Sequence, residues 1–136
     1  MNLLSISDIE FSRRFQAGEV LPSDFNHRAH LRLAYIHLAT HGPIRAVDSF
    51  RDALTGLLQR NGIDATKFHE TLTQAWLLAV WHFMERVGDT TSSAELLQRS
   101  SVLQDPKVML FGPEARMRFV APDLDPILGH EAVHGC

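Results

Sequence analysis

The sequence is poor in cysteine and in long apolar runs. Its one cysteine among 136 residues is Cys136, so an intrachain disulfide framework and a cysteine-rich zinc site are both excluded. No segment approaches the roughly 18 apolar residues of a transmembrane helix, and the start "MNLLSISDIEF" has no basic segment followed by an apolar one. We therefore expect a cytoplasmic protein that has no role in a membrane.

A dominant sign of charge is also missing. The chain has 13 basic and 16 acidic residues, and the basic residues are scattered singly, so we expect no binding to nucleic acid. The hydrophobic content of 45% is enough for one sizeable core, in a chain too short for two full domains. We expect one domain over residues 1–129 and a flexible tail over residues 130–136.

That tail contains the H-E-x-x-H pattern of zinc metalloproteases, from His130 to His134. The chemistry needs both histidines on one face of a helix, with a third ligand from elsewhere. Gly129 and a segment with two prolines come just before the pattern, and two residues follow it, so at most one frayed helical turn is available. We expect no zinc site at this motif.

Strand-like alternation, internal repeats and low-complexity tracts are absent, and the apolar pattern is that of helices. Ser7 and Glu10 have the spacing of a capping box at the start of a first helix. A second helix begins near His27 and ends at Gly42 and Pro43, because these two residues interrupt helical backbone.

Two further segments carry apolar residues at steps of three and four, over residues 43–60 and 66–87, and Gly88 ends the second of them. Short helices follow near residues 92–100 and 113–119, before an extended segment. The sequence predicts an all-α protein, an antiparallel helical bundle of about four main helices with short C-terminal helices and an extended tail.

Three histidines fall on the apolar faces of these predicted helices. At about 100° per residue, His27 and His30 lie on the apolar face of the second helix, and His69 lies on that of the fourth. Glu70 occupies the shoulder of the same buried face, and Thr73 lies beside His69. The two helices must pack together, so we expect the three imidazoles to share one interior site.

This arrangement allows two functions. In the first, His27, His30 and His69 bind a divalent metal such as zinc or iron, with Glu70 as a fourth ligand or a general base, and an open position takes water or a small substrate. The protein would then be a metal-dependent small-molecule enzyme. In the second, the histidines form a closed hydrogen-bond network, and the protein is a non-catalytic module that binds a ligand or a partner.

Three other side chains are candidates for contact with a small ligand. Thr73 offers a hydroxyl inside the site, and Trp76 belongs to an aromatic group that could hold a flat molecule, although aromatic residues at helical spacing usually form core. Arg116 could clamp an anionic ligand, although an arginine near the end of a short helix more often pairs with a nearby glutamate or with terminal carbonyls.

The stretches "FNHRAHLRLAYIHL", "KFHETLTQAW" and "PEARMRFVAPDL" resemble, in this order, conserved blocks of an uncharacterised family of small, predominantly helical bacterial proteins. The resemblance covers most of residues 21–126. It implies that the important polar residues are His27, His30, His69, Glu70, Thr71, Thr73, Glu114, Arg116 and Asp123.

The chain departs from that family in two places. Phe68 replaces the usual tyrosine, which removes a hydroxyl near His69, and "SSVLQDPKVMLFG" replaces an aromatic and serine segment before the "PEAR" block. The family has no assigned activity, so the resemblance identifies residues and leaves the reaction open.

We also expect a homodimer. Tyr35, Ile36 and Trp81 lie outside the main apolar faces of their predicted helices and add more apolar surface than one small bundle buries.

Overall fold

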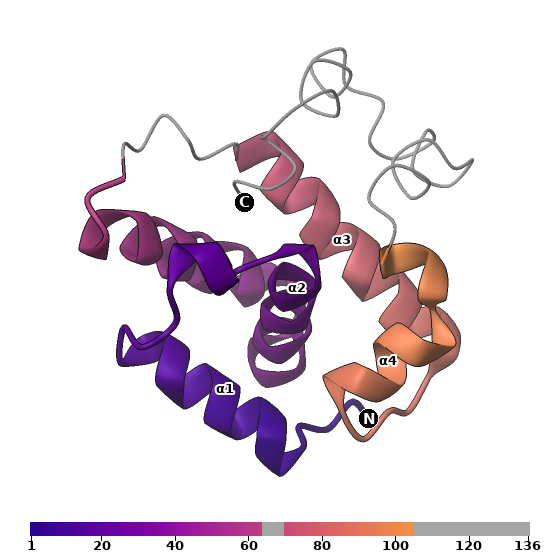
Figure 1. Ribbon diagram of the computed structural model, residues 1–136. Helices are drawn as coiled ribbons and strands as arrows, with labels where there is room; N and C mark the ends of the chain where they lie inside the picture. Colours follow the sequence, from indigo (N-terminus) through magenta and orange to yellow (C-terminus); the bar gives the residue numbers. More distant parts are fainter. Residues whose placement is uncertain (64–69, 105–136) are drawn as a thin grey trace.

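A computed structural model of the protein describes residues 1–63 and 70–104, with side chains from residue 73 onward in the second range. The chain forms the helices α1 (Ile6–Gln16), α2 (His27–Arg60), α3 (Glu70–Val87) and α4 (Ser93–Arg99), with short 3₁₀ turns at Pro22–Asp24 and Ser101–Gln104 (Figure 1). Over these two ranges there is no strand beyond one isolated bridge between Asn2 and Thr90, which confirms the predicted all-α fold. No helix in the same ranges has the length and apolar character to span a membrane.

The first helix begins two residues earlier than its predicted capping box. Ser5 is the N-cap: its hydroxyl accepts a hydrogen bond from the Asp8 N–H, and the Asp8 carboxylate accepts one from the Ser5 N–H. The prediction of a box between Ser7 and Glu10 is therefore wrong. Both pairs have the required spacing, but Asp8 is buried and bonded to other helices, whereas Glu10 is exposed and pairs with Arg13.

Helix α2 is interrupted at Gly42, where the predicted helix stop lies. Gly42 has φ 79° and ψ 167° inside an otherwise helical segment, and Pro43 follows it. This positive φ is open to glycine at little cost. The two arms, residues 27–41 and 43–60, therefore run in different directions (Figure 1), and the prediction of two separate helical segments is confirmed.

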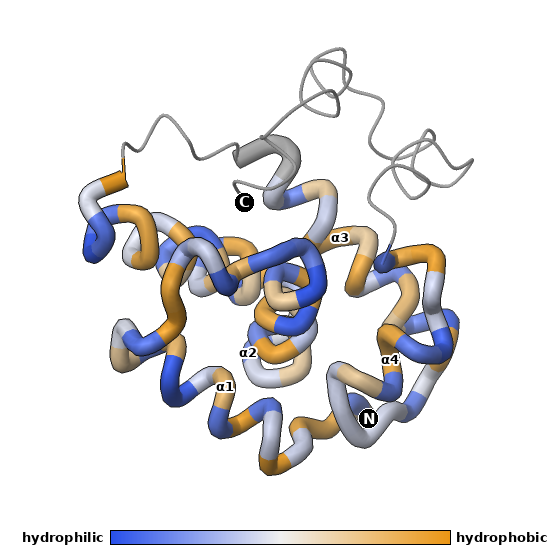
Figure 2. Tube along the Cα trace, viewed as in Figure 1, coloured by the Kyte–Doolittle hydropathy of each residue, from blue (hydrophilic) through white to orange (hydrophobic). Residues whose placement is uncertain are grey.

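The core lies between the arms of α2 and the helices packed around them. Helix α2 packs mainly against α3 and also contacts α1 and α4. Hydrophobic residues recur along every helix (Figure 2). The largest fully buried side chains are Trp76, Tyr35, Phe50, Leu31, Leu33, Leu54, Leu77, Met84, Leu96, Leu97 and Leu103.

The homodimer prediction was based on apolar surface at Tyr35, Ile36 and Trp81. The first two of these residues are buried within a single copy of the chain. Tyr35 is 0% exposed and Ile36 is 3% exposed. The Tyr35 hydroxyl donates a hydrogen bond to the Leu3 carbonyl oxygen and lies 2.8 Å from the Thr90 hydroxyl. The supposed excess of apolar surface is therefore wrong for Tyr35 and Ile36, because both side chains are buried within the chain, and Tyr35 lies against the N-terminal segment.

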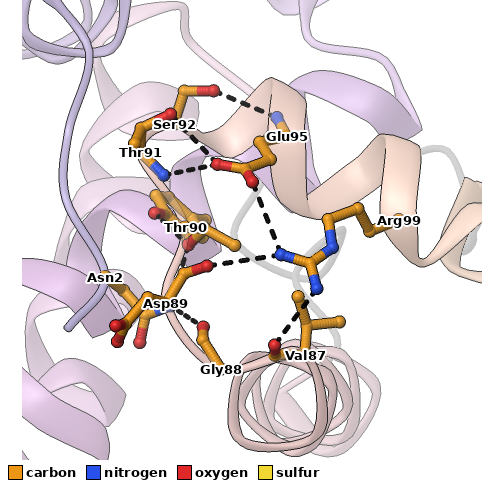
Figure 3. A network of polar contacts seen from close by, with 10 residues as sticks. Asn2, Val87, Gly88, Asp89, Thr90, Thr91, Ser92, Glu95 and Arg99 are labelled. Carbon is orange, nitrogen blue, oxygen red and sulfur yellow. Dashed lines mark hydrogen bonds and ion pairs between the residues drawn. The ribbon is translucent and has the colours of Figure 1, made fainter.

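The segment between α3 and α4 is held by a polar network (Figure 3). The Asn2 side-chain amide donates to the Gly88 carbonyl and to the Thr90 hydroxyl. Glu95, in the first turn of α4, accepts from the Thr91 N–H and hydroxyl, and Arg99 reaches back to Glu95. The start of the chain is thereby fixed beside α4.

Candidate functional site

The first two predicted site residues begin α2. Asn26 caps this helix by accepting a hydrogen bond from the Ala29 N–H, so His27 and His30 follow in the first turn. Residues three positions apart share a helix face, and both imidazoles turn inward: His30 is 2% exposed and His27 is half-buried. The predicted orientation of these two side chains is confirmed.

His27 joins α2 to two other elements. Its Nε2 atom lies 2.9 Å from the Leu103 carbonyl oxygen, and its ring meets the Trp76 ring edge to face, with the centroids 4.7 Å apart. A carbonyl oxygen only accepts hydrogen bonds, so Nε2 carries a proton. In the neutral ring, the lone pair is then on Nδ1.

His30 lies deeper, in an aromatic environment. Its ring centroid is 6.0 Å from that of Phe25 and 5.2 Å from that of Phe50. Neither ring nitrogen has a hydrogen-bond partner within the described part of the chain. Burial, together with the nearby His27, lowers the pKa of His30 to about 3, so the ring is neutral at physiological pH.

Helix α3 supplies two of the predicted ligand contacts. Thr73 and Trp76 are one helical turn apart and are 2% and 1% exposed. The Thr73 hydroxyl also has no hydrogen-bond partner among the described residues. The structure therefore brings Trp76 against His27, and it buries the polar groups of His30 and Thr73 without hydrogen-bond partners among the described residues. Such groups are few in folded proteins.

The other predicted residues fall outside the described side chains. Glu70 is the first residue of α3, but its side chain, His69 and Arg116 are not described. The same holds for the H-E-x-x-H motif of residues 130–134. Among the described side chains, those of residues 1–63 and 73–104, no three His, Cys, Asp or Glu are grouped closely enough to bind a metal. A metal at His27 and His30 would thus need a further ligand from outside this set.

A buried carboxylate that the sequence analysis did not identify lies at a second location. Asp8 is 1% exposed and accepts hydrogen bonds from the N–H and hydroxyl of Ser93 and from Nε of Arg32. Burial alone would raise the pKa of Asp8, but the hydrogen bonds from Ser93, Ser5 and Arg32 outweigh it and lower that pKa below 3.8. The only sequence signal was the Ser5-x-x-Asp8 spacing.

Asp8 also forms part of the wall of a cleft of about 230 Å³, lined further by serines and by Arg28 and Arg32. Both arginines already have partners, since Arg28 donates to Gln104 and Arg32 to Asp8 and Ser7. We therefore interpret the Asp8 cluster as a structural junction between α1, α2 and α4.

The chain was compared with protein-family models, with curated proteins and with solved structures, and no match was found in any of the three. The resemblance to the helical bacterial family stays a prediction. The functional assignment depends on the geometry of the chain itself.

Proposed function

We propose that the protein binds a divalent metal, zinc or iron, in its interior beside α2 and uses it to act on a small molecule. His27 and His30 are two of the ligands, and His69, predicted from the sequence, is the third. Glu70 is a fourth ligand or the general base. The observation that supports the proposal is the buried His30 imidazole, whose two nitrogens have no hydrogen-bond partner among the described residues.

An unpartnered imidazole in a core is unfavourable. A buried polar group without a hydrogen bond costs about 1–3 kcal/mol of folding free energy, and a leucine or phenylalanine would avoid that cost among Phe25 and Phe50. A metal would offset it, because a metal accepts the lone pair of a neutral imidazole. The lowered pKa of His30 keeps the ring in that form.

His27 has the hydrogen bond expected of a metal ligand. A metal-binding histidine commonly donates its second ring N–H to a carbonyl or carboxylate, which fixes the tautomer and the direction of the lone pair. The bond from Nε2 of His27 to the Leu103 carbonyl has this form. A bound metal would supply Lewis-acid activation of water or of a substrate carbonyl, and the Thr73 hydroxyl and Trp76 would contact the substrate.

The alternative is a closed structural network of histidines in a non-catalytic binding module. The bond of His27 to Leu103 suits it, whereas His30 does not, because no donor or acceptor among the described residues reaches its ring. A network of this kind stabilises the fold only when its members are satisfied. The metal site therefore accounts for one more observation than the closed network does.

Elemental analysis of protein purified without a histidine tag tests the proposal. We expect near-stoichiometric zinc or iron, and a chelator should lower the melting temperature, because a metal bound only by the folded state stabilises it. His30→Phe and His27→Ala should each remove the metal, and so should His69→Ala. The exposed His41 provides a matched control, since His41→Ala should retain it.

Two results would count against this site. Metal content near zero in the wild-type protein, with no response to a chelator, would leave the closed network or a metal-free ligand site. Metal that survives His30→Phe but is lost when the chain is truncated after Gly129 would place the metal at His130 and His134 instead.

A further inference from the structure

A second hollow opens between α1 and both arms of α2, and it shares no residue with the proposed metal site. Its cavity volume is about 310 Å³. Phe15, Leu33 and Ala53 give it apolar walls, and its polar lining includes His37, Ser49 and Arg60. The volume is at the small end of the range for ligand pockets, about 300–1,000 Å³. The hollow therefore suits a molecule of few heavy atoms.

Arg60 brings to this hollow a positive charge that no described side chain pairs with. Its Nη2 donates a weak hydrogen bond to the Phe15 carbonyl, at 3.3 Å, and it forms no ion pair with the described side chains of residues 1–63 and 73–104. The exposed Arg13 and Arg14, by contrast, both lie near Glu19. A guanidinium presents a planar set of donors that matches a carboxylate.

The Arg60 side chain lies close to two glycines. A Cβ atom built on Gly56 would lie 3.1 Å from Nη1 of Arg60, and one built on Gly18 would lie 3.3 Å from its Nε. The guanidinium group therefore lies against backbone that carries no Cβ atom, at Gly56 in α2 and at Gly18 just after α1. An alanine at position 56 would require the end of the Arg60 side chain to shift by a few tenths of an ångström.

His37 and Ser49 provide neutral hydrogen-bonding groups in the same hollow. Nδ1 of His37 lies 2.8 Å from the Ser49 hydroxyl oxygen, and that hydroxyl donates to the Ala46 carbonyl. The Ser49 hydroxyl has one proton and two acceptor sites, so it hydrogen-bonds to the His37 ring in either tautomer of His37. Burial, with a contribution from His41, lowers the pKa of His37 to about 4, so this pair adds polarity and no charge.

We propose that this hollow binds a small monocarboxylic acid with a short apolar body. The carboxylate pairs with Arg60, the apolar body lies on Phe15, Leu33 and Ala53, and a polar substituent is within the reach of His37 and Ser49. Asp52 also lines the hollow, and its negative charge disfavours ligands with more than one negative charge, such as inorganic phosphate.

Butyrate and its uncharged analogue butyramide form a matched pair of probes. We expect butyrate to shift the ring resonances of His37 in NMR spectra with a Kd on the order of millimolar, as suits a ligand of so few atoms. Butyramide and inorganic phosphate should bind at least about tenfold more weakly, a difference of 1.4 kcal/mol or more. The metal chelator should have no effect on butyrate binding.

Three variants test the role of Arg60. Arg60→Gln should weaken butyrate binding at least about fivefold, and Gly56→Ala, which requires the guanidinium to shift by a few tenths of an ångström, should weaken it less. Because alanine favours a helix over glycine, Gly56→Ala should not lower the melting temperature, so its loss of binding cannot come from unfolding. Arg14→Gln, which alters an exposed arginine outside the hollow, should bind as the wild type does.

Several results would overturn the proposal. They are the absence of any His37 shift with butyrate at tens of millimolar, equal binding of butyramide, tighter binding of phosphate, and unchanged binding in Arg60→Gln. None of these outcomes bears on the metal content of the protein, so a failure here is distinguishable from a failure of the proposed function.

Discussion

Asp8 and Ser93 lie 85 residues apart in the chain and are joined by two hydrogen bonds in the interior. The Asp8 carboxylate also accepts from the Ser5 N–H and from Arg32. One buried side chain thus connects the start of α1, the first arm of α2 and the start of α4. Such a group stabilises a fold only while all its donors are present, since an uncompensated buried charge is costly.

Asp8→Asn should lower the free energy of unfolding by about 2–3 kcal/mol, because an amide cannot accept from all the donors that face the carboxylate. Urea denaturation at neutral pH measures the loss. The matched control is Glu10→Gln on the same helix, which alters an exposed side chain and should change the midpoint little. Equal midpoints for Asp8→Asn and the wild type would show that the junction is not stabilising.

The same substitution should change the acid stability. The folded-state pKa of Asp8 is lowered from 3.8, so its contribution to stability is complete above 3.8 and is lost as the pH falls through the lowered value. The difference in free energy of unfolding between the wild type and Asp8→Asn should therefore shrink only in this acidic range. A constant difference between the two proteins down to the acid transition would contradict the lowered pKa.

The lowered pKa of His30 predicts that the stability of the fold also depends on pH in a less acidic range. An unfolded chain protonates this histidine near 6.5, whereas the folded protein does so only near 3. Between these values the unfolded state binds the extra proton, so stability should fall by about 1.4 kcal/mol per pH unit below 6.5. Above 6.5 the ring is neutral in both states and contributes no slope.

His30→Phe should remove the part of the slope that His30 contributes, while the part from His37, whose pKa is lowered to about 4, should remain. The phenylalanine would pack among Phe25 and Phe50, and no hydrogen bond would be lost among the described residues, so stability at neutral pH should stay within about 1.5 kcal/mol of the wild type. Urea denaturation with a chelator present, on both sides of pH 6.5, makes the comparison. If the variant keeps the wild-type slope, His30 is not the group responsible.

Two glycines of α2 should respond to alanine with opposite signs. Gly42 has φ 79° and open space where a Cβ would lie, so Gly42→Ala should cost about 1–2 kcal/mol through backbone strain alone. Gly56 is helical, so Gly56→Ala should add about 0.5–1 kcal/mol once the end of the Arg60 side chain shifts. Melting curves of the two variants give both signs, and a stabilised Gly42→Ala would mean that α2 is not broken at that point.

Much of the fold could be predicted from local signals. Gly42 with Pro43 ends a helical segment in the sequence as in the structure, and the apolar face of the second predicted helix correctly placed His30 in the core. These features depend on neighbouring residues and on helical periodicity, both of which a single sequence contains.

The residues missed by the sequence analysis are brought together over long chain distances. Asp8 and Ser93 look like ordinary capping residues until α1 and α4 meet. His37 and Ser49 approach because the chain reverses at Gly42, and the sequence does not give the direction of the second arm. Tyr35 appeared to be surplus aromatic surface because its partners, Leu3 and Thr90, are distant from it in the sequence.

The break at Gly42 also has a consequence for how the chain assembles. Phe50, on the second arm, contacts His30 and His37 on the first, so these contacts close only short loops. The hydrogen bonds between Asp8 and Ser93 and between Asn2 and Thr90 close loops of 85 and 88 residues. The entropy lost in closing a loop grows with its length. The arms of α2 should thus meet first, and in pulse-labelling hydrogen exchange their amides should gain protection before those of α1.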